Sequence, residues 1–135
     1  MHTIDRLRGQ LSLELLLLFA IFLAALAMLS AAAFNTNNSA KSTVNGLLAQ
    51  KAVSDIANVA NDICVLGSGN KRQLHLSLAD ASLLSVSGQN ITISYNNDAF
   101  SKAISCGASA TSFPVKDNVL SIEKNGSTVS IILVS

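Results

Sequence analysis

The sequence predicts an α+β protein in which a long amino-terminal hydrophobic helix continues into an amphipathic helix that packs on a small antiparallel β-sheet. Three observations predict this class. An apolar run over residues 15–34 is interrupted only by Ser30 and is long enough to span a bilayer. Apolar residues then recur at three- and four-residue spacing from Val44 to Ile63, and this stripe is typical of a helix with one buried face. From Lys71 onward the period changes to two, which is typical of strands.

Charge marks the amino-terminal segment. Arg6 and Arg8 precede Gly9, and the positive-inside rule places this basic leader on the cytoplasmic side of a membrane. Glu14 is the last charged residue before Lys41, so a single carboxylate lies at the edge of the apolar run. A charge at the bilayer centre costs roughly 2.5–3.5 kcal/mol on insertion scales, and less near the interface. Such a residue usually has a partner, so Glu14 is a candidate functional residue.

The polar residues of this junction follow a definite spacing, set by Gly9, Gln10, Ser12, Glu14 and Leu18. The pattern resembles the class III signal peptide of archaeal type IV pilins, in which a basic leader and a glycine precede Gln-x-Ser-x-Glu-x-x-x-Leu. The resemblance covers roughly the first thirty residues. It implies that prepilin peptidase, a dedicated membrane enzyme, cleaves between Gly9 and Gln10.

The same resemblance implies a function. The chain is expected to be a structural subunit, a major or minor pilin, of an archaeal type IV pilus-like filament. It would be stored in the membrane and then assemble, with pilus assembly machinery, into a helical homo-oligomer on the cell surface that serves adhesion. Cleavage creates an amine at Gln10, provided that Gln10 does not cyclise. Glu14 then lies one helical turn from this amine or within reach of the amine on the next subunit, and pairing of the two charges is expected to set the register of assembly.

Two other interpretations of the apolar segment remain open. It could be a plain single-pass anchor of a monomeric extracellular binding protein. It could also be an ordinary secretory signal peptide that is cut after Ala31-Ala32-Ala33. Neither explains Glu14 just inside the apolar run or the Gly9-Gln10 junction before it. The mature amino terminus separates the three interpretations.

The organisation expected along the chain has four parts. Weak helix formers over Asn35–Ser39 predict a kink or fraying between the two halves of the helix. Gly67–Asn70 is a strong breaker, so the helix is expected to end near 64–66. The parts are a leader peptide (1–9), a hydrophobic transmembrane or filament-core helix (10–34), an amphipathic second half of the helix (35–66) and a β-rich globular domain (67–135).

Turn signals divide the β-rich domain. Ser87–Asn90, Asn96–Asp98 and the Asn-Gly pair at Asn125 each separate apolar alternating runs, and the last of these is a strong hairpin signal. Residues 99–104 read equally as a short helix or a strand, and 106–114 read as a loop. These signals predict an antiparallel sheet of four to six strands packed on the second half of the helix.

Cys64 and Cys106 are the two cysteines of the chain, and their separation fits no metal-binding motif. In an exported domain they are expected to form a disulfide, while two buried reduced thiols are the alternative. Closing a loop of this length would stabilise the fold by roughly 4 kcal/mol in the chain-entropy model.

Three sequons offer acceptors for N-glycosylation at Asn37, Asn90 and Asn125. Asn125 lies on the predicted turn and is expected to be the most accessible. Asn90 opens a predicted strand. Asn37 would lie in the helical core of a packed filament and is the least favoured.

Composition argues against several classes of function. The chain has nine basic and eight acidic residues, and seven of each remain after the leader is removed, so no basic face for nucleic acid emerges. His75 alternates with leucines on a predicted strand and is expected to face outward alone. The acidic residues show no paired spacing. We therefore expect no enzyme, no cofactor and no metal site.

Overall fold

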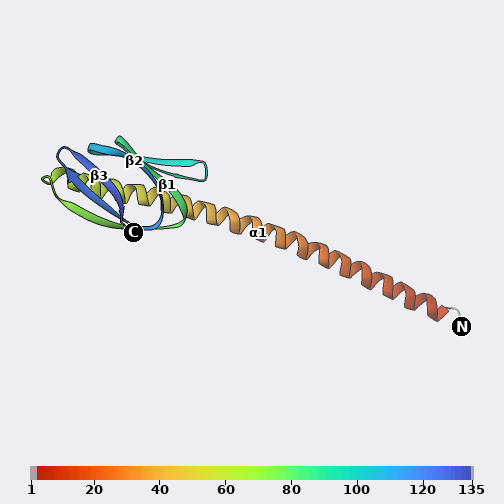
Figure 1. Ribbon diagram of the computed structural model, residues 1–135. Coiled ribbons are helices and arrows are strands. Elements are labelled where there is room, and N and C mark those ends of the chain that lie inside the picture. The colour runs from red at the N-terminus through yellow and green to blue at the C-terminus, as the bar shows by residue number, and fades with distance from the viewer. Residues whose placement is uncertain (1–2, 135) are drawn as a thin grey trace. The chain divides into compact units, whose positions relative to one another are not determined.

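The computed structural model describes the backbone of Thr3–Val134 and the side chains of residues 13–134. The elements follow in the order α1 (Thr3–Val65), β1 (Lys71–Tyr95), β2 (Asp98–Asn125) and β3 (Thr128–Val134), as Figure 1 shows. The chain divides into two compact units, an amino-terminal unit (residues 1–41) and a carboxyl-terminal unit (residues 42–135). A long apolar helix followed by a small sheet confirms the predicted α+β class.

The amino-terminal unit is helical throughout its described residues. Asn35–Ser39 are part of α1, so the weak helix formers there do not interrupt it and the predicted fraying is not observed. Ser30 donates a hydrogen bond from Oγ to the carbonyl of Leu26 (2.9 Å), and Thr36 donates from Oγ1 to the carbonyl of Ala32 (3.0 Å). Because these hydroxyls bond to the preceding turn, they need no partner from outside the helix.

The carboxyl-terminal unit begins with the last turns of α1, which bury one face. Small and β-branched residues occupy this face, and the alanines allow the helix to approach the sheet closely. The predicted stripe is confirmed except at its start, where Val44 remains 53% exposed. The helix ends at Val65, where it was predicted to end, and Gly69 follows with a positive φ of 88°. The buried residues are Ala49, Ala52, Val53, Ile56, Ala57, Ala60 and Ile63.

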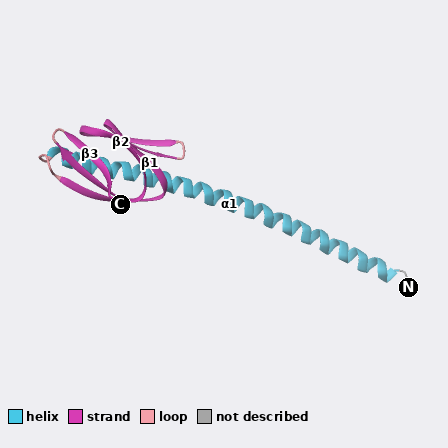
Figure 2. Ribbon diagram, in the orientation of Figure 1, coloured by secondary structure: helices cyan, strands magenta, loops and turns pink. Residues whose placement is uncertain are grey.

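The strands lie around this part of the helix, as the magenta and cyan elements of Figure 2 show. Their order in the sheet is β1-β2-β3, and β1 and β2 pair antiparallel from Lys71↔Glu123 to Tyr95↔Asp98. The turn between them is the predicted one. Asn96 and Asn97 have φ values of 58° and 96°, and two central residues with positive φ are typical of a type I′ hairpin.

The predicted number of strands is wrong. Within the described chain the structure has three strands, because β1 and β2 run through positions that resemble turns. Residues 87–90 lie inside β1, where Gly88 (φ 60°) adjoins two register shifts, and residues 106–114 lie inside β2. Residues 99–104 are also strand. Register shifts let long paired strands bend without ending, so local Gly and Ser content misidentifies such bends as turns.

The last strand pairs with β2 in two places. Residues 119–125 of β2 pair with β3 in opposite directions along the chain, from Val119↔Val134 to Asn125↔Thr128, so the two segments form an antiparallel hairpin. Thr128 and the next residue also pair in parallel with 107–108, so the start of β3 lies between two stretches of β2. Gly126, at the first position of the two-residue turn, has a φ of 64°. The hairpin predicted from the Asn-Gly pair is therefore confirmed.

One hydrophobic core joins the helix to the sheet. The sheet contributes alternate residues of all three strands to the buried face of α1. Tyr95, Phe100 and Phe113 pack against this core without being fully buried, so aliphatic side chains fill its centre. The buried hydrophobic residues from the strands are Leu76, Leu78, Leu84, Val86, Ile91, Ile93, Ile104, Val115, Leu120, Ile122, Val129 and Ile131.

Candidate functional site

Residues 15–34 of the amino-terminal unit present apolar side chains on every side of the helix, interrupted only by Ser30. From Leu13 the helix is long and apolar enough to cross a membrane, by length and composition, and its most apolar window has none of its residues buried. Leu15 is 73% exposed, Phe22 56% and Met28 74%. A helix that is hydrophobic all round requires either lipid or other apolar helices around it.

The bulky side chains near the start of this surface form a shallow apolar hollow. It is lined by Leu15, Leu16, Leu18, Phe19 and Phe22. Leu15, Leu18, Phe19 and Phe22 recur at three- and four-residue spacing and therefore share one face of the helix. Side chains on such a face form the ridges and grooves into which the side chains of a second helix pack. This hollow is a candidate contact surface for a partner helix.

Glu14 directly precedes the first residue that lines the hollow, and its side chain is exposed. Within the part of the chain whose side chains are described, Glu14 makes no ion pair. The cleavage junction, Gly9 and Gln10, lies outside the residues whose side chains are described. Pairing of Glu14 with a new amine at Gln10 therefore stays a prediction.

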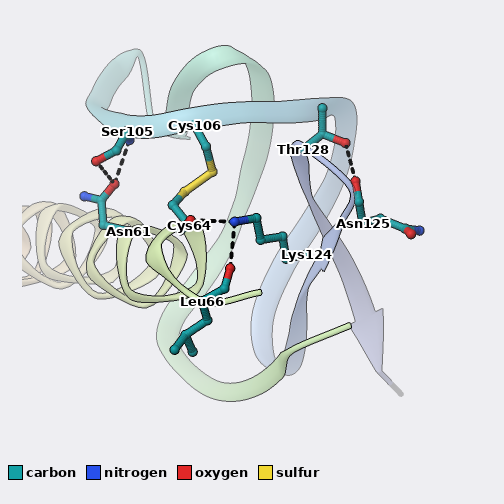
Figure 3. Close-up of a disulfide and its surroundings, with 8 residues drawn as sticks. All are labelled: Asn61, Cys64, Leu66, Ser105, Cys106, Lys124, Asn125 and Thr128. Carbon is teal, nitrogen blue, oxygen red and sulfur yellow. Dashed lines mark hydrogen bonds between the residues drawn. A yellow bond between two sulfur atoms is a disulfide. The ribbon is translucent and has the colours of Figure 1, made fainter. Parts of the chain in front are cut away.

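A disulfide closes the carboxyl-terminal unit at the end of the helix. Cys64 in the last turn of α1 is bonded to Cys106 in β2, with a Cα–Cα distance of 5.8 Å across a sequence separation of 42. Figure 3 shows this bond beside the residues that surround it. The predicted disulfide is present in the structure, so the reduced-thiol alternative does not hold there.

Lys124 is a second tie between the helix end and the sheet. Its Nζ donates hydrogen bonds to the carbonyl of Cys64 (2.6 Å) and to that of Leu66 (2.7 Å), as Figure 3 shows. The last carbonyls of a helix have no intrahelical partner and carry partial negative charge, so a lysine is favourable there. Sequence reasoning missed this role because 58 to 60 residues separate Lys124 from these acceptors.

The backbone joins the same two segments. Gly69 donates from its N–H to the carbonyl of Lys124 (2.9 Å), and Lys124 donates to the carbonyl of Asn70 (3.0 Å). The N–H of Gly126 donates to Ser68 Oγ (3.0 Å). The turn that follows α1 is thereby fixed to the β2–β3 hairpin.

Polar side chains tie the helix to β2 nearer its middle. Asn61 Oδ1 accepts hydrogen bonds from the N–H of Ser105 (2.7 Å) and from its hydroxyl (2.9 Å). Lys102 donates from Nζ to Ser54 Oγ (2.8 Å). Together with the Cys64 bond, these contacts hold one stretch of β2 along about three turns of the helix.

A separate network lies near the other end of the domain. Asn45 Nδ2 donates to Asp80 Oδ2 (2.7 Å) and approaches the hydroxyl oxygen of Tyr95 (3.0 Å). The Tyr95 hydroxyl donates to the same carboxylate oxygen (3.1 Å). The Asp80 carboxylate, inside β1, thus binds both Asn45 of α1 and Tyr95 at the end of β1, and nothing in the local sequence indicated it.

The remaining predicted sites are spread over the surface. Asn37 is exposed on α1, Asn90 is exposed in β1, and Asn125 is exposed at the end of β2. His75 is exposed as predicted, with Nε2 3.5 Å from Asp117 Oδ1. Among the described residues no group of three His, Cys, Asp or Glu side chains could hold a metal ion.

Comparison with known proteins decides the character of the amino-terminal segment. The family model of the class III signal peptide matches residues 8–32. The chain is type IV pilin-like. No curated protein and no solved structure matches it. The match includes Gly9, Gln10 and Glu14, and ends within the apolar run.

This pilin-like protein therefore has a segment that implies processing by prepilin peptidase and entry into pilus assembly. The signal peptide and the apolar helix fit a precursor anchored in the membrane that later joins a surface pilus. The class III signal peptide family is structural and not enzymatic.

Proposed function

We propose that this protein is a structural subunit of a type IV pilus-like surface filament, held in the membrane by its apolar helix until it assembles. One observation carries the proposal: a class III signal peptide leads directly into a helix whose apolar surface is exposed on every side. The leader would be residues 1–9, the filament-core helix 10–34, the amphipathic half of the helix 35–66 and the outward domain 67–135.

Glu14 is the residue that we propose to set the register of assembly. Residues 15–29 are nearly uniform in apolar character, so apolar contact alone distinguishes poorly between one register and the next. An amine at Gln10, on the same or the neighbouring subunit, would neutralise the carboxylate in surroundings of low dielectric constant. An unpaired carboxylate in those surroundings is costly, so each subunit would stop where the two charges meet.

The carboxyl-terminal unit is proposed to face the medium and to serve adhesion. Its polar surface, its disulfide and its own buried core support an extracellular location. Cells that lack the protein are expected to lose filaments and to attach less to surfaces, and restoring the gene product should recover both.

Two measurements on filaments sheared from cells test the proposal. Electron microscopy should show filaments, and peptide identification should find this chain in them with Gln10 as its first residue. A mature chain that begins at Met1 and stays monomeric in the membrane would favour the anchored binding protein. A chain that begins after Ala33 would favour ordinary secretion.

Cleavage can be tested separately from assembly. Gly9 has no side chain, which allows the backbone to enter a narrow protease site. Gly9→Val should leave unprocessed precursor in the membrane, detected as a species of higher mass, whereas Gly9→Ala, the smallest change, should be processed more than Gly9→Val. Processing of Gly9→Val at the wild-type rate would contradict the assigned junction.

A further inference from the structure

The three sequons differ sharply in what the folded chain offers to a modifying enzyme. We propose that Asn125 is the N-glycan acceptor of this protein and that Asn90 and Asn37 are left unmodified. The proposal rests on the proposed export of the carboxyl-terminal unit, because N-glycans are added to exported, exposed Asn-x-Ser/Thr segments. The three sequons differ in the exposure and hydrogen bonding of their second and third residues, and the sequence motif alone gives no information on either property.

The chemistry defines what must be accessible. The side-chain amide nitrogen of asparagine forms a bond to the anomeric carbon of a lipid-phosphate-linked oligosaccharide. The bond from that carbon to the phosphate oxygen breaks, the lipid phosphate leaves, and the amide nitrogen loses one proton. The enzyme must therefore reach the asparagine amide and the hydroxyl two residues later.

Asn125 meets these requirements. Asn125, Gly126 and Ser127 are all exposed, and the asparagine side chain points away from the sheet in Figure 3. Among the described residues, neither the Asn125 amide nor the Ser127 hydroxyl takes part in a hydrogen bond. An added Cβ at Gly126 would meet no atom within 4 Å, so the middle of the sequon is open space.

The backbone holds this turn from its inner side. Ser68 Oγ accepts from the N–H of Gly126 (3.0 Å), and the carbonyl of Asn125 accepts from Thr128 Oγ1 (3.2 Å). The hydrogen bonds thus engage backbone groups and leave the side chains of Asn125 and Ser127 directed outward. The sequon is presented by a fixed hairpin, with its reactive groups free.

Asn90 offers its amide but not the rest of its sequon. Ile91, the middle residue, is completely buried in the core, at 0% exposure. Thr92 is half-buried and donates its hydroxyl to Ser101 Oγ (3.2 Å). An enzyme could engage this sequon only by removing Ile91 from the core and breaking the Thr92 bond, which costs free energy at every attempt.

Asn37 is excluded by its backbone. Residues 37–39 are inside α1, so their backbone groups are part of the helical hydrogen-bond ladder and cannot adopt an extended form without breaking it. In the proposed filament this helix is also surrounded by other helices. Of the three sequons, the helical one is therefore closed both before and after assembly.

Mass spectrometry of the protein from its own cells tests the proposal. The peptide that contains Asn125 should carry a sugar mass, and both Asn125→Gln and Ser127→Ala should remove it completely. Asn90→Gln is the matched control and should leave the mass unchanged. The two variants at the turn affect exposed side chains, and the Cys64–Cys106 peptide link reports that each variant is folded.

Two results would overturn the proposal: an unmodified Asn125 peptide in the wild-type protein, or a sugar mass that disappears with Asn90→Gln or Asn37→Gln. Failure of the proposed function is read out independently. Filaments built from unmodified chains that begin at Gln10 would refute the glycan alone. Modified chains that never form filaments would refute the filament role alone.

Discussion

The two units of this chain use the same kinds of residue in opposite ways. In the amino-terminal unit, Leu15 and Met28 are 73% and 74% exposed, whereas in the carboxyl-terminal unit Ile56, Leu84 and Ile122 are at 0%. The carboxyl-terminal unit supplies its own surroundings for its apolar residues. The amino-terminal unit leaves that task to lipid or to other subunits, so its folding partner must be found outside the chain.

The largest effect is expected at Glu14. Glu14→Gln keeps the shape and removes the charge, so it should still insert and still be cleaved but lower the number of filaments per cell by about tenfold or more, because the new amine then lacks its charged partner in surroundings of low dielectric constant. Asp98→Asn is the matched control, because it removes an exposed carboxylate from the carboxyl-terminal unit. Filaments counted by electron microscopy, with precursor and mature chain separated by mass, give both readouts.

Abundant, ordered filaments from Glu14→Gln would refute charge pairing. Equal filaments from Glu14→Ala as well would remove the side chain from assembly altogether. A fall of the same size in Asp98→Asn would show that loss of any carboxylate has this effect, and would erase the contrast between the units.

A smaller effect, on stability alone, is expected in the core. Ile56→Ala should lower the free energy of unfolding of the carboxyl-terminal unit by about 2–5 kcal/mol, because it leaves a cavity in a fully buried site. Leu17→Ala removes a comparable side chain that is 58% exposed and should leave that unfolding unchanged. Denaturation in detergent micelles, followed by the fluorescence of Tyr95, measures both. Equal losses would mean that the two units do not fold independently.

Removing the disulfide is expected to lower the free energy of unfolding about as much as Ile56→Ala does, or slightly less. Cys64→Ser with Cys106→Ser should lower the free energy of unfolding by about 2–4 kcal/mol, since the unfolded chain regains the freedom of a 42-residue loop. Cell-surface amounts of the variant should fall accordingly. An unchanged unfolding midpoint in non-reducing buffer would mean that the bond does not constrain the unfolded chain.

The smallest effect is expected at Lys124. Lys124→Met retains the stem but leaves the carbonyls of Cys64 and Leu66 without their charged donor, which should cost about 1 kcal/mol. Lys116→Met changes an exposed lysine elsewhere on β2 and should cost less. The Lys124 cost should grow when the disulfide is also removed, because both ties then fail to hold the same helix end. Strict additivity in a double-mutant cycle would contradict that coupling.

The sequence predicted the features that depend on residues close together in the chain. The apolar run, the stripe over 48–63, the helix end before Gly67 and the Asn-Gly hairpin all follow from periodicity or from single residues with special φ values. Cys64 and Cys106 could be paired because they are the two cysteines of the chain. The signal-peptide pattern at Gly9 to Leu18 gave the functional class, since its polar residues stand against an apolar background.

The features that the sequence could not predict depend on contacts between residues far apart in the chain. The length of β1 and β2 is set by how each strand pairs with the other, and Gly88 or the 106–114 stretch appears as a break only when read alone. Lys124, Asn61 and the Asn45–Asp80–Tyr95 network act on residues between 15 and 60 positions away. Such contacts leave no periodic signal in one sequence.

The disulfide has a further consequence for life outside the cell. Because it joins Cys64 to Cys106, all of β1, the first hairpin turn and the start of β2 lie within one covalent ring. A protease that cuts once anywhere inside this ring opens the ring but does not sever the chain. The amino-terminal helix and the last strand remain parts of one molecule after such a nick.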